Sequence, residues 1–261
     1  MKEKIYTTFI KGKIYDLWIS DEPAFIRDCT KRQVPVIEYI HEAAVKNNES
    51  IDDVYSGTSG SFLTPWAADS VEAVRSNPEY MEKVLHRFAG EPLVVAENDD
   101  LIIRELCESD EELVEQIFNE GGASGYVDIW SGCEEDKKKA LKDYCRLHYD
   151  LYGYGYYGVE IKGENALAGI IGFREYKKNA GEITEGGQKK KQDYLVFVIR
   201  GRNPEETPLE LGYVMGEKYR RRGYCVSACR ELIKKIPGDV YIVVDKNNIP
   251  GVRTAKKILV Q

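Results

Sequence analysis

The sequence has no long apolar run, and only three of its 261 residues are histidine. None of its apolar stretches approaches the roughly 20 residues that a membrane-spanning helix needs. The first residues, MKEKIYTTFIKGK, lack the apolar core of a signal peptide. We therefore expect a cytoplasmic protein with no membrane partner.

The cysteines and histidines are too scattered for a metal site or a disulfide framework. The six cysteines include no CxxC pair, and His41, His86 and His148 lie far apart. We expect free thiols and no bound metal.

Positive charge is also in short supply, since the formal net charge is −7. Binding to a phosphate backbone depends on basic surface, so nucleic acid is not expected as a general partner. Basic or amine-bearing substrates remain compatible with this charge. A length of 261 residues with 43% hydrophobic content predicts a well-formed core and two domains.

A strand pattern runs directly into a helix pattern between Leu209 and Ile236. Apolar residues from Leu209 to Val214 precede a basic turn, Arg220–Cys225 (RRRGYC), and the helical pattern ends at Pro237-Gly238. Such a turn leaves backbone N–H groups unpaired at the positive end of a helix, and Gly223 allows a phosphate to approach the backbone. The turn predicts a pyrophosphate site. Short glycine motifs also match by accident, so the turn taken alone favours the alternative, an ordinary solvated basic turn.

Three motifs in this part of the chain carry a family resemblance. Arg220-x-x-Gly223-x-Cys225 resembles the R/Q-x-x-G-x-G/A signature of the GNAT superfamily of acyl-CoA N-acyltransferases, with Cys225 replacing the last small residue. The ELGY segment from Glu210 resembles the E-I-G-Y strand of the branch that includes ribosomal-protein N-terminal acetyltransferases. The NNIPGVR segment from Asn247 is similar to that branch's N-x-A-S-I-R helix start.

The resemblance implies a fold, an activity and a cofactor. We expect an α/β (α+β) protein: a GNAT-like, mostly antiparallel sheet flanked by helices over 98–261, after a small α/β domain of unknown role over 1–97. The implied activity is transfer of an acetyl group from acetyl-CoA to a primary amine by direct attack in a ternary complex. The acceptor would be an amine-bearing small molecule or a protein N-terminus, and the chain a monomer or homodimer.

The resemblance also implies where acetyl-CoA binds. The strand from Glu210 to Met215 would separate from its neighbour and pair with the pantetheine arm, with an N–H near Met215 polarising the thioester carbonyl. Amides of the turn would hold the pyrophosphate, and Asn248 would contact the pantetheine end. The expected cofactor-binding residues are Val214, Met215, Arg220, Arg221, Arg222, Gly223, Tyr224, Cys225 and Asn248.

Glu210 is the candidate catalytic residue. Alkylammonium groups are mostly protonated at pH 7, so a base must remove a proton before the amine attacks. A carboxylate on a largely apolar strand is suited to this task. The alternatives are an outward-facing strand residue and one that is ion-paired with a neighbouring lysine.

Two departures from the family leave other functions open. The position equivalent to the family's thiolate-protonating tyrosine is Ala255, and the chain ends at Leu259-Val260-Gln261 without the family's glycine-aromatic pair. Either the chain is shortened there or the last strand is supplied differently. A catalytically silent acyl-CoA-binding module is therefore an alternative, and a nucleotide-phosphate binder is another, although no Walker-type Gly-Lys-Ser/Thr follows the strand.

Elsewhere the patterns predict the remaining elements. A βαβ unit is expected from strand Lys13–Ser20, helix Glu22–Lys31 and strand Val34–Ile40. Asp21 resembles, weakly, a strand-end aspartate of haloacid-dehalogenase-like hydrolases, and its alternative role is a helix cap. Further helices are expected over Asp69–Ser76, Glu79–Phe88, Glu111–Asn119 (capped by Ser109-Asp110) and Glu134–Tyr152, and strands over Leu101–Leu106, Tyr154–Lys162, Ala166–Glu175 and Tyr194–Arg200.

Two connections have expected roles. The glycine-rich connection Gly121–Gly132, with Tyr126 and Trp130, belongs to a region that lines the acceptor cleft in the family. The excursion between Tyr176 and Pro208 is expected to form an extended hairpin beside that cleft.

Overall fold

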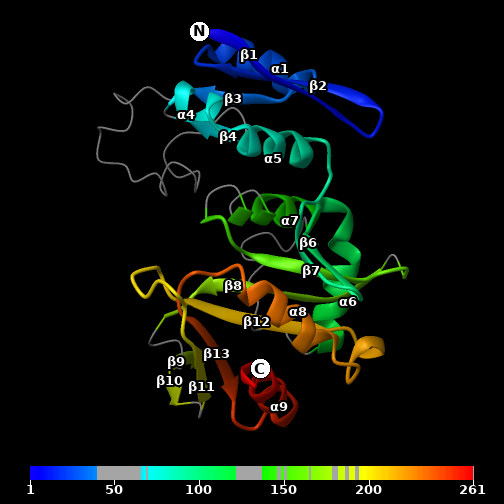
Figure 1. The fold of residues 1–261 in the computed structure, drawn as a ribbon, viewed down its shortest axis with the longest axis vertical. Coiled ribbons are helices and arrows are strands. Elements are labelled where there is room, and N and C mark those ends of the chain that lie inside the picture. Colours follow the sequence, from blue (N-terminus) through cyan, green and yellow to red (C-terminus); the bar gives the residue numbers. More distant parts are fainter. Residues whose placement is uncertain are drawn as a thin grey trace. The chain divides into compact units, whose positions relative to one another are not determined.

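The structure is a computed structural model that describes residues 1–39, 66–68, 70–121, 137–145, 148–149, 152–164, 166–177, 182–185, 188–191 and 194–260 (Figure 1). The glycine and serine residues of Tyr55–Ser61 predict a loop there. This segment and most of the Gly121–Gly132 connection lie outside the described residues. The chain divides into two compact units, Met1–Leu93 and Val94–Gln261. No helix of the described part is long and apolar enough to cross a membrane.

The first unit is built on a four-stranded sheet in the order β1-β2-β3-β4. The predicted βαβ unit is present, because β2 (Lys13–Ser20) and β3 (Val36–Tyr39) are parallel and α1 (Pro23–Lys31) connects them. β1 (Lys2–Ile10), which was not predicted, forms an antiparallel hairpin with β2, and β4 (Trp66–Ala68) lies parallel to β3. Helices α4 (Val71–Arg75) and α5 (Pro78–Phe88) confirm two predicted helices.

The helix-cap role considered for Asp21 is wrong. The residue at the N-cap of α1 is Glu22, which makes no side-chain cap bond. Ser20 Oγ accepts a hydrogen bond from the Glu22 N–H at 3.0 Å, while the Asp21 carboxylate pairs with the Met1 ammonium group. The Ser20 hydroxyl therefore holds the backbone between β2 and α1.

The second unit contains a seven-stranded sheet in the order β11-β13-β12-β8-β7-β6-β5. Every neighbouring pair is antiparallel except β12 and β13, which confirms the predicted mostly antiparallel architecture. The strands are β5 (Val94–Glu97), β6 (Leu101–Glu105), β7 (Tyr156–Ile161), β8 (Leu167–Glu175), β11 (Tyr194–Ile199), β12 (Leu209–Met215) and β13 (Val240–Asp245).

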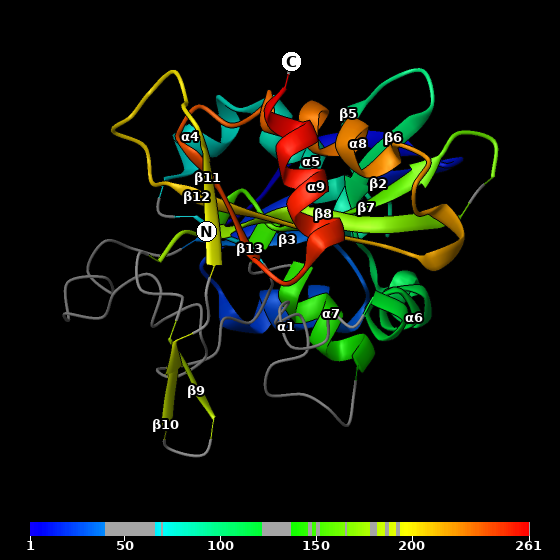
Figure 2. The same ribbon diagram turned by 90° about the horizontal axis from the view of Figure 1, so that it is seen from below.

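Helices cover both faces of this sheet (Figure 2). The short 3₁₀ turn η1 (Glu108–Asp110), then α6 (Glu111–Gly121) and α7 (Lys137–Cys145), lie on one face. Asp110 Oδ2 accepts a hydrogen bond from the Cys107 N–H at 2.9 Å, which caps the start of this segment. Helices α8 (Tyr224–Ile233) and α9 (Ile249–Leu259) lie on the other face.

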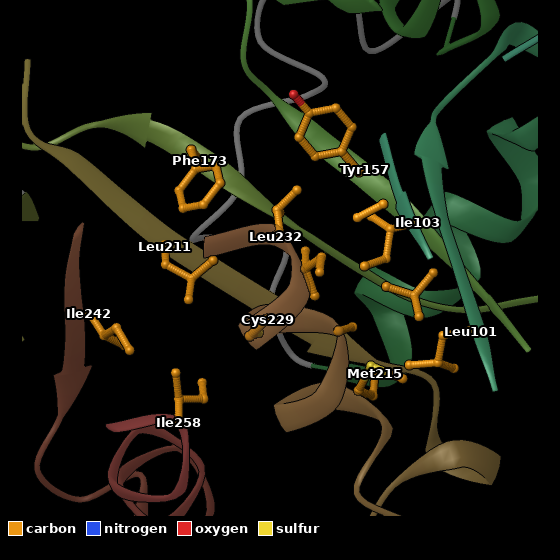
Figure 3. Close-up of a cluster of buried hydrophobic side chains, with 14 of the residues drawn as sticks. Leu101, Ile103, Tyr157, Phe173, Leu211, Met215, Cys229, Leu232, Ile242 and Ile258 are labelled. Carbon is orange, nitrogen blue, oxygen red and sulfur yellow. The ribbon is translucent and has the colours of Figure 1, made fainter. Parts of the chain in front are cut away.

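The core between the sheet and α8 fixes the position of that helix. Side chains from β6, β7, β8, β12 and β13 meet Cys229 and Leu232 of α8 and Ile258 of α9 in one cluster (Figure 3). Leu101, Ile103, Phe173 and Cys229 are fully buried. Burying this apolar surface contributes roughly 25 cal/mol per Å², so the orientation of α8 against β12 is strongly determined.

Two predicted elements differ from the structure. The excursion between Tyr176 and Pro208 does not form a single hairpin: β9 (Glu182–Glu185) pairs with β10 (Gln188–Lys191), while β11 joins the main sheet beside β13. β11 is an edge strand, YLVFVI, on which Leu195 and Val196 are exposed. The helix predicted over Glu134–Tyr152 is only partly among the described residues. Nine of its residues form α7, and residues 148, 149 and 152 have π-helical geometry.

Candidate functional site

Strands β12 and β13 separate soon after they meet. β12 is in register with β8 along its whole length, from Leu209 opposite Glu175 to Met215 opposite Gly169. With β13 it has only two register pairs, Leu209 with Val240 and Glu210 with Tyr241. Beyond Glu210, no described strand lies in register on that side of β12, so an opening forms in the sheet.

Peptide groups of β12 point into this opening. The Leu209 N–H donates to Asp239 O at 3.0 Å on the β13 side, whereas the Gly216 N–H donates to Ala168 O at 3.0 Å on the β8 side. Because successive peptide groups alternate along a strand, those of Tyr213 and Met215 face the opening and that of Val214 faces β8. The free edge can therefore pair with an extended amide-containing ligand.

The turn before α8 presents further unpaired donors. Gly223 is the N-cap of α8 and has φ +88°, and Arg221 has φ +63°. The first backbone bond of α8 runs from the Ser227 N–H to Gly223 O at 3.1 Å, so the N–H groups before it in the helix have no acceptor in the described chain. A side chain at 223 would project into open space, since nothing lies within 4 Å of an added Cβ. Arg221 and Arg222 are exposed beside these donors, an arrangement that favours an anion over a cation at the turn.

Arg220 has a different contact set from its neighbours. Its Nε donates to Met215 O at 2.9 Å and its Nη2 to Glu120 O at 3.0 Å. The guanidinium thus connects the end of β12 to the end of α6 and fixes the start of the turn. Its Nη1 also pairs with Glu217 Oε1 at 3.6 Å, so its donors are directed at protein groups.

Tyr224 and Cys225 contribute backbone to the surface and side chain to the core. Both side chains pack against the cluster beneath α8, and the Cys225 thiol contacts Cys229, whose thiol pKa is raised well above its usual value by burial. The thiol of Cys225 therefore points inward where the family has a smaller residue. The five described cysteines are free thiols, as predicted for them.

Asn248 is the N-cap of α9. Its Oδ1 accepts a hydrogen bond from the Gly251 N–H at 3.0 Å, at the start of the helix that Ile249-Pro250 begins. The side-chain oxygen is therefore engaged in capping. Ala255, in the middle of α9, is fully buried and presents no acidic group.

Glu210 is buried and paired with an arginine. Its side chain is 8% exposed, and Arg174, its register partner on β8, donates from Nη2 to Glu210 Oε1 at 2.6 Å. The partner is an arginine of the adjacent strand, where the sequence suggested a lysine. Oε2 is also buried and has no hydrogen-bond partner among the described residues. Oε2 is therefore the carboxylate oxygen that Arg174 leaves unbonded.

Sequence reasoning missed three tyrosines around Glu210. The Tyr156 ring crosses Gly212, where an added Cβ would lie 2.9 Å from the phenolic oxygen. Burial raises the Tyr156 pKa to about 12; Arg174 opposes the shift and Glu210 adds to it. Tyr176 and Tyr241 stack with ring centroids 3.9 Å apart and planes at 6°. Arg174 and Tyr176 are two residues apart at the end of a predicted strand. Side chains with this spacing point to the same face of a sheet, so the sequence could have predicted that these two lie on one face.

Residues 100–258 match the sequence profile of the family described as acetyltransferase (GNAT) domain. This chain belongs to the GNAT acetyltransferase family. The match covers more than half of the chain and includes the opening, the turn and Glu210. Acetyltransferases of this family use acetyl-CoA, which was the predicted cofactor.

Several solved structures of low sequence identity are similar to part of this chain. A GNAT-family acetyltransferase from Bacillus anthracis is 21% identical, with 64% of this chain and 81% of that chain covered and a TM-score of 0.41. A putative ribosomal-protein-serine acetyltransferase from Vibrio cholerae is 18% identical, with coverage of 63% and 81% and a TM-score of 0.42. The microcin C7 self-immunity acetyltransferase MccE, solved with acetyl-CoA and AMP, is 13% identical, with coverage of 62% and 79% and a TM-score of 0.41. No curated protein matches.

Proposed function

We propose that this chain transfers the acetyl group of acetyl-CoA to a primary amine, by direct attack within a ternary complex. The observation that carries the proposal is the free edge of β12 directly before the unpaired N–H groups of α8. An extended pantetheine arm needs backbone amides, and a pyrophosphate needs a cluster of N–H donors at a helix N-terminus. Both are present along one continuous segment.

The residues that would hold acetyl-CoA follow from the geometry. Tyr213 and Met215 would pair with the pantetheine amides, and the backbone from Arg221 to Cys225 would surround the pyrophosphate. Asn248 would contact the ligand through Nδ2, because Oδ1 is engaged in capping. Bound acetyl-CoA supplies the activated acyl group.

Glu210 would prepare the acceptor. Oε2 accepts a proton from the ammonium group, while Arg174 holds Oε1 and fixes the orientation of the carboxylate. Removing that proton produces the neutral amine that can attack a carbonyl. A backbone N–H of β12 that faces the opening would stabilise the negative charge on the carbonyl oxygen. The acceptor is an amine-bearing small molecule or a protein N-terminus.

A silent acyl-CoA-binding module is the second candidate function. The bond between Glu210 and Arg174, together with a buried alanine at 255, favours it because both reduce the groups available for proton transfer. Such a protein would bind the cofactor without turning it over.

One experiment separates the two. Acetyl-CoA should raise the melting temperature of the full chain in either case, since a ligand of the folded state stabilises it by mass action. Thiol release from acetyl-CoA should then depend on added amine for an enzyme and be absent for a binding module. No shift in melting temperature at saturating acetyl-CoA would refute both.

A further inference from the structure

Arg174, Glu210 and Tyr241 lie side by side on one face of the sheet. Glu210 is in register with Arg174 of β8 and with Tyr241 of β13. The residues next to them in sequence, Phe173, Leu211 and Ile242, point into the cluster beneath α8 (Figure 3). Because side chains alternate along a strand, Arg174, Glu210 and Tyr241 point to the opposite face.

Two more tyrosines complete this surface. Tyr176 is two residues beyond Arg174 and stacks on Tyr241, and Tyr156 reaches across Gly212 from β7. We call Tyr156, Tyr176, Tyr241 and Glu210 the tyrosine face. It lies at the closed end of the opening between β12 and β13, where an acceptor would meet an acyl group held along β12.

The charges near this face are already arranged in pairs. Arg174 donates to Glu210 Oε1, and Arg200 pairs with Asp239, which also accepts a hydrogen bond from the Gly201 N–H at 2.9 Å. The polar atom without a partner in the described residues is Glu210 Oε2, on a residue that is 6% exposed. A buried unsatisfied carboxylate oxygen is costly, and an ammonium donor would satisfy it.

The rings favour the same kind of ligand. The face of a tyrosine ring attracts a cation through its quadrupole, by about 0.5–2 kcal/mol depending on desolvation. Tyr176 and Tyr241 are half-buried and stand parallel beside Glu210, so both ring surfaces and the carboxylate favour positive charge next to hydrocarbon. A carboxylate brought to this place would be repelled by the buried carboxylate of Glu210, whose own partner is Arg174.

We infer that the tyrosine face binds the acceptor and selects an alkylammonium group with no carboxylate on the adjacent carbon. The inference rests on the proposed function and narrows its substrate class: alkylamines and peptide N-termini fit, and free α-amino acids do not. Specificity then comes from a repulsive term against the amino-acid carboxylate as well as from attraction to the amine.

The test compares phenethylamine with phenylalanine, which share the ring and the primary amine and differ in the carboxylate. Thiol release by the full chain should give a kcat/KM at least tenfold higher for phenethylamine. A comparison of alaninamide with alanine extends the test to the N-terminus of a peptide. Activity with phenethylamine alone would indicate a small alkylamine as the acceptor, and activity with alaninamide alone would indicate a peptide N-terminus. Equal values within each pair, or a preference for the amino acids, would overturn the inference.

Tyr241→Leu and Tyr241→Phe test the ring itself. Leucine removes the π surface and should raise the KM for phenethylamine by roughly 2- to 30-fold, the range that 0.5–2 kcal/mol of cation–π attraction corresponds to. Phenylalanine keeps the surface and should restore the parent KM. The KM for acetyl-CoA should stay constant in both variants. An unchanged KM for phenethylamine in folded Tyr241→Leu would remove the ring from acceptor binding.

Amine binding is also measured without turnover. With coenzyme A present, phenethylamine should raise the melting temperature more than phenylalanine does. A chain that binds acetyl-CoA but releases no thiol with any amine refutes the proposed acetyl transfer. Equal melting shifts for the two compounds refute the selectivity of the tyrosine face, whether or not transfer occurs.

Discussion

The two ends of β12 carry two different kinds of candidate site. At Met215 and the turn that follows it, the functional groups are backbone N–H groups from one continuous segment. At Glu210 they are side chains from β7, β8, β12 and β13, brought together by strand register. A backbone site is local in sequence and therefore has a readable motif, whereas a side-chain site depends on which strands become neighbours.

The largest expected effect is at the side-chain end. Glu210→Gln should lower turnover by roughly 10²–10⁴-fold, the usual contribution of positioned proton transfer, with acetyl-CoA affinity retained. The loss should become smaller as pH rises, because free amine then becomes abundant without a base. The measurements are the pH–rate profile, the melting temperature and coenzyme A affinity.

Arg174→Gln is the matched control for this variant. It breaks the same ion pair but keeps the carboxylate, so it lowers stability as Glu210→Gln does. If turnover per folded molecule is normal in Glu210→Gln, the glutamate has only a structural role with Arg174.

At the backbone end, Gly223→Val should abolish the stabilisation by acetyl-CoA. That stabilisation is about 2.7 kcal/mol at a ligand concentration of 100 times Kd. A β-branched side chain would occupy the space in front of the helix N-terminus, and it is strained at φ +88°.

Gly163→Val controls for the strain. Gly163 has φ +87°, lies in the turn between β7 and β8, and also has nothing within 4 Å of an added Cβ. It should lower the melting temperature by a similar amount and keep the full shift with acetyl-CoA. An intact ligand shift in Gly223→Val would mean that the turn does not bind the cofactor.

Arg220→Lys should have an intermediate effect. A lysine keeps the charge but cannot donate to both Met215 O and Glu120 O, so the turn loses its connection to β12 and α6. We expect a loss of about 1 kcal/mol in unfolding free energy and weaker coenzyme A binding, measured by denaturation and calorimetry. Arg222→Lys, at an exposed neighbouring position, is the control. Parent-like binding in Arg220→Lys would show that the charge alone matters.

Two substitutions of Asn248 separate its role as a helix cap from its proposed contact with the ligand. Asn248→Ala should cost about 1 kcal/mol of stability through loss of the α9 cap. Asn248→Asp keeps the capping oxygen and should keep the stability, while it removes the Nδ2 donor. Weaker coenzyme A binding by the aspartate variant at unchanged stability supports the proposed contact, and unchanged binding argues against it.

The smallest expected effect is that of removing the first unit, which should leave coenzyme A affinity unchanged. We propose that the part from residue 98 onward binds coenzyme A alone, because the opening, the turn and Asn248 all lie within Val94–Gln261. A chain that starts at Val94 should therefore bind coenzyme A with parent affinity in calorimetry. A fragment that unfolds cooperatively but does not bind would place part of the site before Val94.

Local sequence patterns predicted most helices and strands of the second unit. The features that they did not predict depend on pairing between strands that are far apart in the sequence. The apolar, strand-forming residues of β6, β7 and β8 and the breaks at Gly163 and Pro237 were sufficient to place these elements. Nothing in the segment Tyr194–Ile199 specifies that its partner is β13, because the pairing joins residues more than forty positions apart. The bond from Arg174 to Glu210 and the Tyr176–Tyr241 stack follow from strand order in the same way.

The place of β11 in the sheet has a consequence for biosynthesis. This uncharged strand is made before its only described strand partner, β13, so on the ribosome it waits for Val240–Asp245 to be translated. At about 5–20 residues per second that delay lasts a few seconds. During it, a six-residue β-branched and aromatic segment is exposed, with the composition typical of intermolecular strand pairing. Slower translation after Ile199 should therefore increase aggregation of the nascent chain, and a lysine at Val196 should reduce it.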